Sequence, residues 1–265
     1  MIHFLILFSF IHLQNDTTAY TITEKTAKHT RIERSNYPEI QKSGKTIESF
    51  LPDRWKIIAE ASGDLNKDGV SDEAVVIESL DTLPYEWTIY HAGDTMWGYN
   101  KITIRTSEDT VMTHQAAARI LLILIKQPDS SWQCAVQSNH AILHSDEGGM
   151  QGDPFDEEYL KIRRGSIYIT LQGGGGGLPY QTTHQYRYQK DDWYLIGFSG
   201  SWFNSGTWTS ESTEFNLLTG KGRIEKTNEN KRSTNSKNIK IGKKPLRKLR
   251  DFRPYEWEVY KDEWI

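Results

Sequence analysis

The sequence predicts a mainly β fold, an antiparallel sandwich or a partial-propeller-like meander with one short N-terminal helix. Three observations support this fold class. Short apolar segments, alternating or continuous, recur between turn signals along most of the chain. Aromatic residues make up 12% of the 265 residues, with 9 Trp and 13 Tyr, and such flat side chains suit a pleated surface. Connections of hairpin length and composition, Arg164-Gly165 and Lys190-Asp191-Asp192, join several of these segments.

The composition is that of a globular protein with a sizeable core. Hydrophobic residues make up 37% and charged residues 25% of the chain, and the mean hydropathy is -0.64. The single cysteine, Cys134, excludes a disulfide within the chain, so stability has to come from the core, from a bound metal or from both. We expect one β-rich domain over residues 38–265, preceded by a flexible lead-in over residues 20–37.

The apolar run over residues 4–13 has the length of a signal-peptide core and is too short to span a bilayer. Thr17 and Ala19 supply small residues at the −3 and −1 positions of a cleavage site, although only His3 precedes the run where a positive charge is usual. We predict a signal peptide over residues 1–19 and export to the periplasm or the extracellular space. No later stretch predicts a transmembrane segment in the mature chain.

The first elements are expected in the following order. Residues 39–51 carry a short helix, which Pro52 stops. Strands follow over residues 74–78, 88–91 and 101–106. Residues 119–126, RILLILIK, form a continuous apolar run of the length and β-branched content of a strand buried on both faces.

The rest of the chain reads as a meander of short strands separated by turn signals. No period repeats the acidic loop described below, so a complete propeller of identical blades is not predicted. The expected strands cover residues 132–138, 160–163, 166–172, 181–189, 193–198, 207–217 and 223–226.

The segment over residues 221–250 is strongly basic. Twelve Lys and Arg residues against two Glu give it a net charge of +10, whereas the whole chain carries -3. Such a segment binds an anionic partner or lies against the acidic body of its own protein. We favour the second interpretation, because Ile239, Ile241, Leu246, Leu249 and Phe252 give the segment apolar residues to bury.

The loop over residues 64–72 has the pattern D-x-N-x-D-G-x-x-D, which is typical of a calcium-binding turn. Calcium takes about six to eight oxygen ligands, so a short loop has to direct alternate side chains to one side. Gly69 permits the sharp turn that brings the next carbonyl to the ion. The predicted ligands, at positions 1, 3, 5, 7 and 9, are Asp64, Asn66, Asp68, Val70 through its carbonyl, and Asp72, directly or through water.

This loop is not an EF-hand. An EF-hand loop ends with a bidentate Glu at position 12, and that position is Val75 here, within a run of strand type. We therefore expect that helices do not flank the loop. The alternative is a turn rich in Asp and Asn that binds no metal.

The segment GDLNKDGVSDEAVVIES, residues 63–79, resembles the loop-and-strand unit of FG-GAP and VCBS-type repeats, in which calcium organises the turn between strands. More broadly, the chain resembles uncharacterised exported bacterial proteins in which one such loop precedes a buried strand, a GG-x-x-GDPF segment, a glycine-rich turn and an aromatic hairpin. Those proteins often have GGS-x-x-RW after the glycine turn, where this chain has GGGGGLPY, so the role of that Arg and Trp is not carried over. The resemblance implies an envelope location and calcium, and it supplies no reaction. The matching residues are 121–124, 148–155, 173–177 and Tyr186-Arg187-Tyr188.

Two glycine-rich segments, residues 148–155 and 173–177, are either tight connections or loops that flank a cleft. In the second case Asp153 or Asp146 is the candidate general acid or base of a glycan or peptide hydrolase, which is the alternative function. His140, His144 and His184 near these aspartates invite a zinc or acid–base interpretation. Because the chain lacks HExxH and G-x-S-x-G, we expect surface or satisfied histidines and no serine nucleophile.

Trp202, Phe203 and Trp208 form an aromatic-rich turn, which is a stacking surface for a sugar or a peptide if exposed and part of the core if buried. Together these features predict an exported, calcium-stabilised binding or structural module with no identifiable catalytic site. Its expected partner is a protein or a glycan, and nucleic acid is not expected. An immunity or inhibitor protein that docks an aromatic face on an enzyme is a further alternative, which the sequence does not separate from the first.

Overall fold

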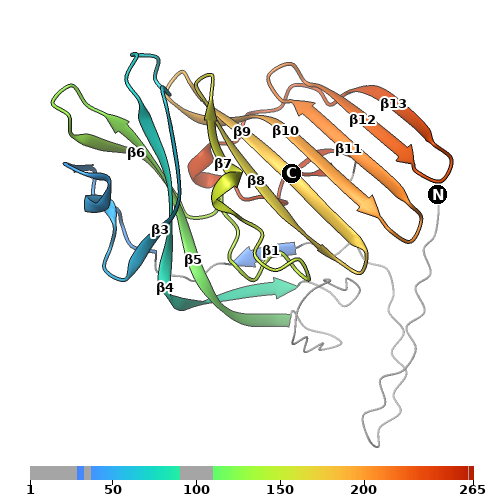
Figure 1. Cartoon of the computed structure of the whole chain (residues 1–265), viewed down its shortest axis with the longest axis horizontal. Coiled ribbons are helices and arrows are strands. Elements are labelled where there is room, and N and C mark those ends of the chain that lie inside the picture. Colours follow the sequence, from blue (N-terminus) through green and yellow to red (C-terminus); the bar gives the residue numbers. More distant parts are fainter. Residues whose placement is uncertain (1–28, 33–36, 90–109, 262) are drawn as a thin grey trace, which may run out of the picture.

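The computed structural model describes residues 29–32, 37–89, 110–261 and 263–265. In these ranges the protein is mainly β, as predicted, with two large antiparallel sheets and a small C-terminal hairpin (Figure 1). The described part of the chain contains no α-helix and no helix long and apolar enough to cross a membrane. The predicted signal peptide lies outside the described residues.

The first sheet has six strands and occupies the left of Figure 1. Its two long central strands are β4 (Asp72–Ile89) and β5 (Thr110–Lys126). The edge of β4 away from β5 pairs with two strands, β3 near its start and β1 near its end. The shorter strands are β1 (His29–Ile32), β2 (Ser43–Gly44), β3 (Trp55–Gly63) and β6 (Trp132–Ser138).

The second sheet is a seven-stranded meander in which each strand pairs with the next one along the chain. The predicted two-residue hairpin connection Arg164-Gly165 is confirmed, with positive φ angles of 50° and 68° that match the turn geometry of such hairpins. The strands are β7 (Leu160–Arg163), β8 (Ser166–Gly175), β9 (Leu178–Gln189), β10 (Asp192–Asn204), β11 (Thr209–Asn216), β12 (Lys221–Asn228) and β13 (Ser233–Lys240). A 3-10 turn, η2 (Glu157–Tyr159), precedes β7.

The partial-propeller alternative is wrong. A propeller is built from four-stranded blades arranged around a channel. Here the strands join into one six-stranded and one seven-stranded sheet, and the described residues contain no four-stranded unit that recurs.

The predicted helix over residues 39–51 is also wrong, and only a four-residue 3-10 turn, η1 (Ile47–Phe50), occurs there. The rest of the segment is held extended against β6, which takes up the backbone groups that a helix would use. The Ile40 N–H donates to Gln137 Oε1 at 3.0 Å, and the Lys42 carbonyl accepts from the Cys134 N–H at 2.9 Å. Of the predicted strands at 88–91 and 101–106, Thr88 and Ile89 end β4 and the remaining residues lie outside the described ranges.

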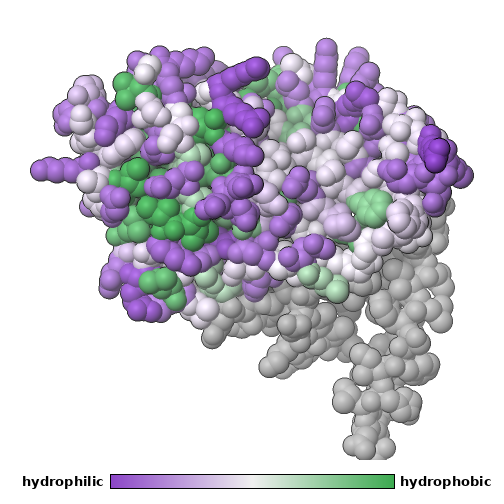
Figure 2. Space-filling model, in the orientation of Figure 1, coloured by the Kyte–Doolittle hydropathy of each residue, from purple (hydrophilic) through white to green (hydrophobic). Residues whose placement is uncertain are grey.

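β5 contains the predicted strand that is buried on both faces. The side chains of residues 119–124 are at most 2% exposed. One face belongs to a core cluster with residues of the seven-stranded sheet, and the other packs beneath Ile40 and Phe50. Figure 2 shows hydrophobic side chains gathered over the six-stranded sheet, whereas the visible face of the seven-stranded sheet is mostly hydrophilic.

The apolar residues of the basic segment pack into the protein's own core, as predicted, whereas most of its basic side chains are exposed. Ile239, Ile241 and Leu249 are buried in the main core cluster. Lys248 and Arg250 form ion pairs of 3.0 and 3.1 Å with the buried Asp192 carboxylate. After a 3-10 turn, η3 (Leu249–Asp251), the chain ends in a hairpin of β14 (Glu258–Tyr260) and β15 (Glu263–Trp264).

The burial of β5 predicts the cost of truncating Leu122, which is 1% exposed. Leu122→Ala removes methyl groups from a close-packed layer and should lower the free energy of unfolding by about 2–5 kcal/mol. The matched control is Leu80→Ala, because Leu80 is 56% exposed; it should change stability by less than about 0.5 kcal/mol. Urea denaturation of both variants measures the difference, and equal losses would contradict the assignment of β5 to the core.

Candidate functional site

The predicted calcium loop connects β3 to β4, so no helix flanks it, as expected; the strand that precedes it, β3, was not predicted. The Asp64 carboxylate stabilises the turn by accepting hydrogen bonds from its backbone. Its Oδ1 accepts from the Lys67 N–H at 2.6 Å, and its Oδ2 accepts from the Gly69 N–H at 3.0 Å. Gly69 has a φ of 85°, a backbone conformation that glycine adopts without steric cost.

Asn66 and Asp68 are joined to each other on the exposed side of the loop. Asn66 Nδ2 donates to Asp68 Oδ2 at 2.8 Å, and Asn66 Oδ1 accepts from the Asp68 N–H at 3.0 Å. Asp68 Oδ1 accepts from the Val70 N–H at 2.8 Å. Each of these oxygens accepts one such bond and has a second lone pair, so the side chains retain acceptor capacity for an ion.

Asp72, the predicted ligand at position 9, occupies a different place. Its side chain is completely buried, with Oδ2 accepting from the Leu65 N–H at 2.9 Å and Oδ1 from the Lys126 N–H at 3.0 Å. Burial raises the pKa of the Asp72 carboxyl, and the backbone N–H groups that it accepts oppose this rise. Asp72 thus anchors the base of the loop to the end of β5.

The loop lies where the two sheets meet. A Cβ on Gly63, the last residue of β3, would come within 2.4 Å of Cγ2 of Ile162 in β7. A Cβ on Gly165, in the turn after β7, would lie 3.7 Å from the Asp64 carbonyl oxygen. The conformation of the loop is therefore coupled to the packing of one sheet on the other.

The loop suits calcium by the chemistry of its donors. The Asp64 and Asp68 carboxylates, the Asn66 amide and the Val70 carbonyl all supply hard oxygen atoms. In the described part of the chain, no three His, Cys, Asp or Glu side chains form a group that could hold a metal. The loop contributes only two side chains of these kinds, Asp64 and Asp68, because its other two donors are an amide and a backbone carbonyl. Calcium at these residues and at Asp72 stays a prediction.

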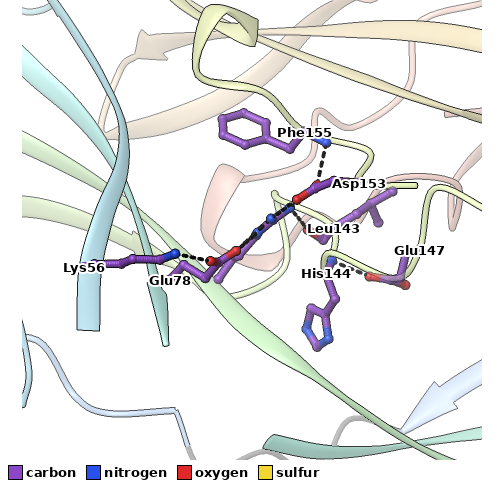
Figure 3. A network of polar contacts seen from close by, with 8 residues as sticks. Lys56, Glu78, Leu143, His144, Glu147, Asp153 and Phe155 are labelled. Carbon is purple, nitrogen blue, oxygen red and sulfur yellow. Dashed lines mark hydrogen bonds and ion pairs between the residues drawn. The ribbon is translucent and has the colours of Figure 1, made fainter. Parts of the chain in front are cut away.

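A second polar site is built around the buried Arg119, and its partners Glu78, Leu143 and Asp153 are labelled in Figure 3. The Arg119 side chain is 2% exposed and donates from Nε to Glu78 Oε2 at 2.8 Å. Its Nη1 donates to the Leu143 carbonyl at 3.1 Å and to Asp153 Oδ1 at 2.7 Å, and its Nη2 donates to Asp153 Oδ2. Burial lowers the pKa of Arg119, but the two carboxylates raise it by more. The guanidinium therefore stays charged inside the protein.

This network engages Asp153, the candidate general acid or base. Besides the two bonds from Arg119, Asp153 Oδ1 accepts from the Phe155 N–H at 3.0 Å (Figure 3). Both carboxylate oxygens thus accept from the guanidinium, and Oδ1 also caps a turn. The hydrolase interpretation gains no support from Asp153.

The two glycine-rich segments pair with each other. The Gly174 N–H donates to the Gly148 carbonyl at 3.0 Å, and the Met150 N–H donates to the Gly174 carbonyl at 2.9 Å. Gly174 has a φ of 118°, and a Cβ there would lie 2.2 Å from the Leu178 carbonyl oxygen. The segments are close backbone contacts, which agrees with tight connections and not with two loops flanking a cleft.

The histidines lie in two different environments. Tyr37 contacts both His140, ring against ring at 6.2 Å, and His144, whose Nε2 is 3.0 Å from the Tyr37 hydroxyl. His184 lies in β9, is 1% exposed and is packed between the rings of Phe198 and Phe252 at 5.2 and 5.3 Å. Burial lowers the pKa of His184 to about 3. His184 is therefore a neutral core residue.

A pocket of about 390 Å³ opens between the seven-stranded sheet and the C-terminal hairpin. The aromatic turn is neither wholly exposed nor wholly buried: Trp202 is half-buried and lines this pocket, whereas Trp208 is 54% exposed and lies outside the lining. Of the residues that line the pocket, the sequence pattern marks only Trp202. The other lining residues are brought to Trp202 by the register of the strands and by the return of the C-terminal segment to the sheet, which no local pattern predicts. The lining residues are Tyr180, Trp202, Glu211, Tyr255, Glu263 and Trp264.

The buried imidazole of His184 predicts a loss of stability in acid. Its pKa is about 3 when folded and near 6.5 when unfolded, so only the unfolded chain takes up a proton between these values. The contribution is complete above pH 6.5 and is lost as the pH falls toward 3. His184→Phe, which suits the aromatic surroundings, should remove on the order of 3 kcal/mol of this loss between about pH 7 and 4. Urea denaturation across this range checks it, and equal pH slopes would contradict the assignment.

The buried guanidinium of Arg119 predicts a second effect. Arg119→Met leaves Glu78 in the interior without its main partner and should lower the free energy of unfolding by about 3–5 kcal/mol. The control is Arg54→Met, which removes the exposed pair to Asp81, whose side chains are 60% and 50% exposed; it should cost at most about 1 kcal/mol. Similar losses in the two variants, measured by chemical denaturation, would show that Arg119 contributes no more than a surface pair.

Comparisons of the chain with protein-family models, with curated proteins and with solved structures found no match in any of the three. The resemblance to FG-GAP and VCBS-type repeats stays a prediction from the loop over residues 64–72. What the sites offer chemically is a set of oxygen donors at the sheet junction and an aromatic pocket with carboxylates at its wall.

Proposed function

We propose that the protein is an exported binding module whose fold is stabilised by calcium at the loop over residues 64–72. The observation that carries the proposal is the donor set of Asp64, Asn66, Asp68 and the Val70 carbonyl in one turn between two strands. The N-terminal apolar run supports export.

Calcium would act through the position of the loop. The Asp64 and Asp68 carboxylates repel each other across a short turn, and a divalent cation reverses that repulsion. Asp72 ties the base of the loop to β5, and Gly63 packs it against β7. An ion that orders the turn therefore also orders the junction of the two sheets, and it stabilises the folded state by mass action.

The sandwich form of the fold belongs to the same proposal. Val76 and Leu121 of the six-stranded sheet and Ile169 of the seven-stranded sheet are members of one core cluster. Two antiparallel sheets with a shared apolar layer are the arrangement of a sandwich. Such a scaffold would present the loop and the pocket on a rigid support.

Binding is favoured over hydrolysis by the state of Asp153. The Asp153 side chain is 44% exposed, but both of its oxygens accept bonds from the Arg119 guanidinium, which stabilises the ionised carboxylate and disfavours a role as general acid. The expected partner is a protein or a glycan, because the aromatic pocket offers a stacking surface to either.

The calcium proposal predicts a metal-dependent melting temperature. At a calcium concentration about 100 times the Kd, the folded state gains about 2.7 kcal/mol, which for a chain of this size raises the Tm by about 5–10 °C. Thermal melting followed by circular dichroism, with calcium and with a chelator, measures the shift. Asp64→Ala and Asp68→Ala should abolish it.

The matched control is Asp53→Ala, because Asp53 is an exposed aspartate in the turn before β3 and outside the loop. This variant should keep the full calcium shift. Equal melting temperatures of the wild-type protein in calcium and chelator, together with no calcium by metal analysis, would overturn the proposal.

A further inference from the structure

Three strands of the seven-stranded sheet contribute directly opposed residues to the lining of the aromatic pocket. Tyr180 in β9 pairs with Trp202 in β10, and Trp202 pairs with Glu211 in β11. Glu211 in turn is opposite Lys226 in β12. Opposed residues of an antiparallel sheet project on the same face. The pocket wall therefore contains a row of two aromatic rings and a carboxylate, and the Lys226 ammonium group lies beside that carboxylate on the same face of the sheet.

The indole of Trp202 packs against the sheet in the space left by the absent side chain of Gly200. A Cβ on Gly200 would lie 2.4 Å from Cη2 of Trp202, so the ring lies over Gly200. Trp202 also packs against the main core cluster while remaining half-exposed. A ring fixed in this way loses little entropy when a ligand stacks on it.

The opposite wall comes from the C-terminal segment. Tyr255 meets Tyr180 edge to face, with ring centroids 5.6 Å apart and planes at 80°, and its hydroxyl is 2.9 Å from Thr182 Oγ1. Trp264 in β15 is 50% exposed. The pocket volume of about 390 Å³ lies within the range of small-molecule sites, about 300–1,000 Å³.

The Glu211 carboxylate at the wall is already paired. Lys226 Nζ lies 2.6 Å from Glu211 Oε2, and the two side chains are 68% and 30% exposed. The pair therefore offers hydrogen-bond acceptors and donors to a ligand, and Glu263 adds a second carboxylate to the lining. A cationic ligand would have to compete with Lys226 for the Glu211 carboxylate, and an anionic ligand would meet that carboxylate directly.

We infer that this pocket binds a neutral saccharide. A pyranose ring has an apolar C–H face that stacks on an aromatic ring, and hydroxyl groups that both donate and accept hydrogen bonds at its edge. Trp202 and Trp264 would supply the stacking faces, and the Glu211–Lys226 pair would bind neighbouring hydroxyls. The inference rests on the proposed function, because it names the ligand class of the binding module.

The test is isothermal titration of the full chain, in calcium, with cellotriose, maltotriose, xylotriose, mannotriose and chitotriose. Each is used at about 10 mM, so that a site with a Kd of about 1 mM is filled. At least one trisaccharide should bind, and Trp264→Ala should weaken that binding by about tenfold or more. Trp202→Ala should do the same, and Glu211→Gln, which keeps the shape of the side chain, should weaken it by a smaller factor.

The matched control is Trp208→Ala, because Trp208 is as exposed as Trp264 and lies in the turn after β10, outside the pocket lining. This variant should bind as the wild-type protein does. Trp202→Ala removes a ring that also packs on the core, so its folding is checked by circular dichroism. Trp264→Ala and Glu211→Gln keep the test decisive if Trp202→Ala does not fold.

Three results would overturn the inference. The first is no heat of binding with any of the five trisaccharides, and the second is equal weakening by Trp208→Ala and Trp264→Ala. The third is binding of tetralysine, lost in Glu211→Gln, in place of a saccharide, which would identify a cation site. The melting temperature with and without calcium, measured on the same samples, keeps the two proposals apart, because a calcium shift without saccharide binding overturns only this inference.

Discussion

The burial of one guanidinium sets the arrangement of the fold. Arg119 is the first residue of the buried run in β5 and is itself buried, so its charge has to be neutralised inside the protein. Glu78 meets it from the neighbouring strand, in register, and Asp153 meets it from the connection between β6 and β7. This second contact draws the connection back onto β5. The seven-stranded sheet accordingly begins where β7 packs against β3.

β4 carries two buried acids, and the protein satisfies them in opposite ways. Asp72 at its first residue is met by backbone N–H groups, whereas Glu78 is met by the cations of Arg119 and Lys56. One acid fixes the loop between β3 and β4, and the other fixes the crossing from one sheet to the other. The proposed metal loop and the buried ion pair are thus both anchored by residues of a single strand, β4.

Hydrophobic periodicity predicted most strands but not the contacts between them. The ranges of β6 and β7 and the doubly buried run in β5 follow from local pattern, because apolar residues there face the core. β13 was not predicted as a strand, because of its eight residues only Ile239 is buried and no alternation results. The predicted helix failed because β6 holds residues 40–44 extended. The loop donors could be read from spacing alone, but the Asp72 anchor and the pocket depend on strand register and on the return of the C-terminus.

The positive charges on β13 affect how one molecule of the protein can associate with another. β13 is the last strand of the seven-stranded sheet in the described structure, so one row of its backbone groups has no neighbouring strand within the sheet. Such a row is a template for strand addition by another molecule. Lys237 and Lys240 project from this border among small polar side chains, and all residues of β13 but one are exposed. Two such borders repel each other and offer no apolar stripe, so the molecule resists polymerisation along its open margin.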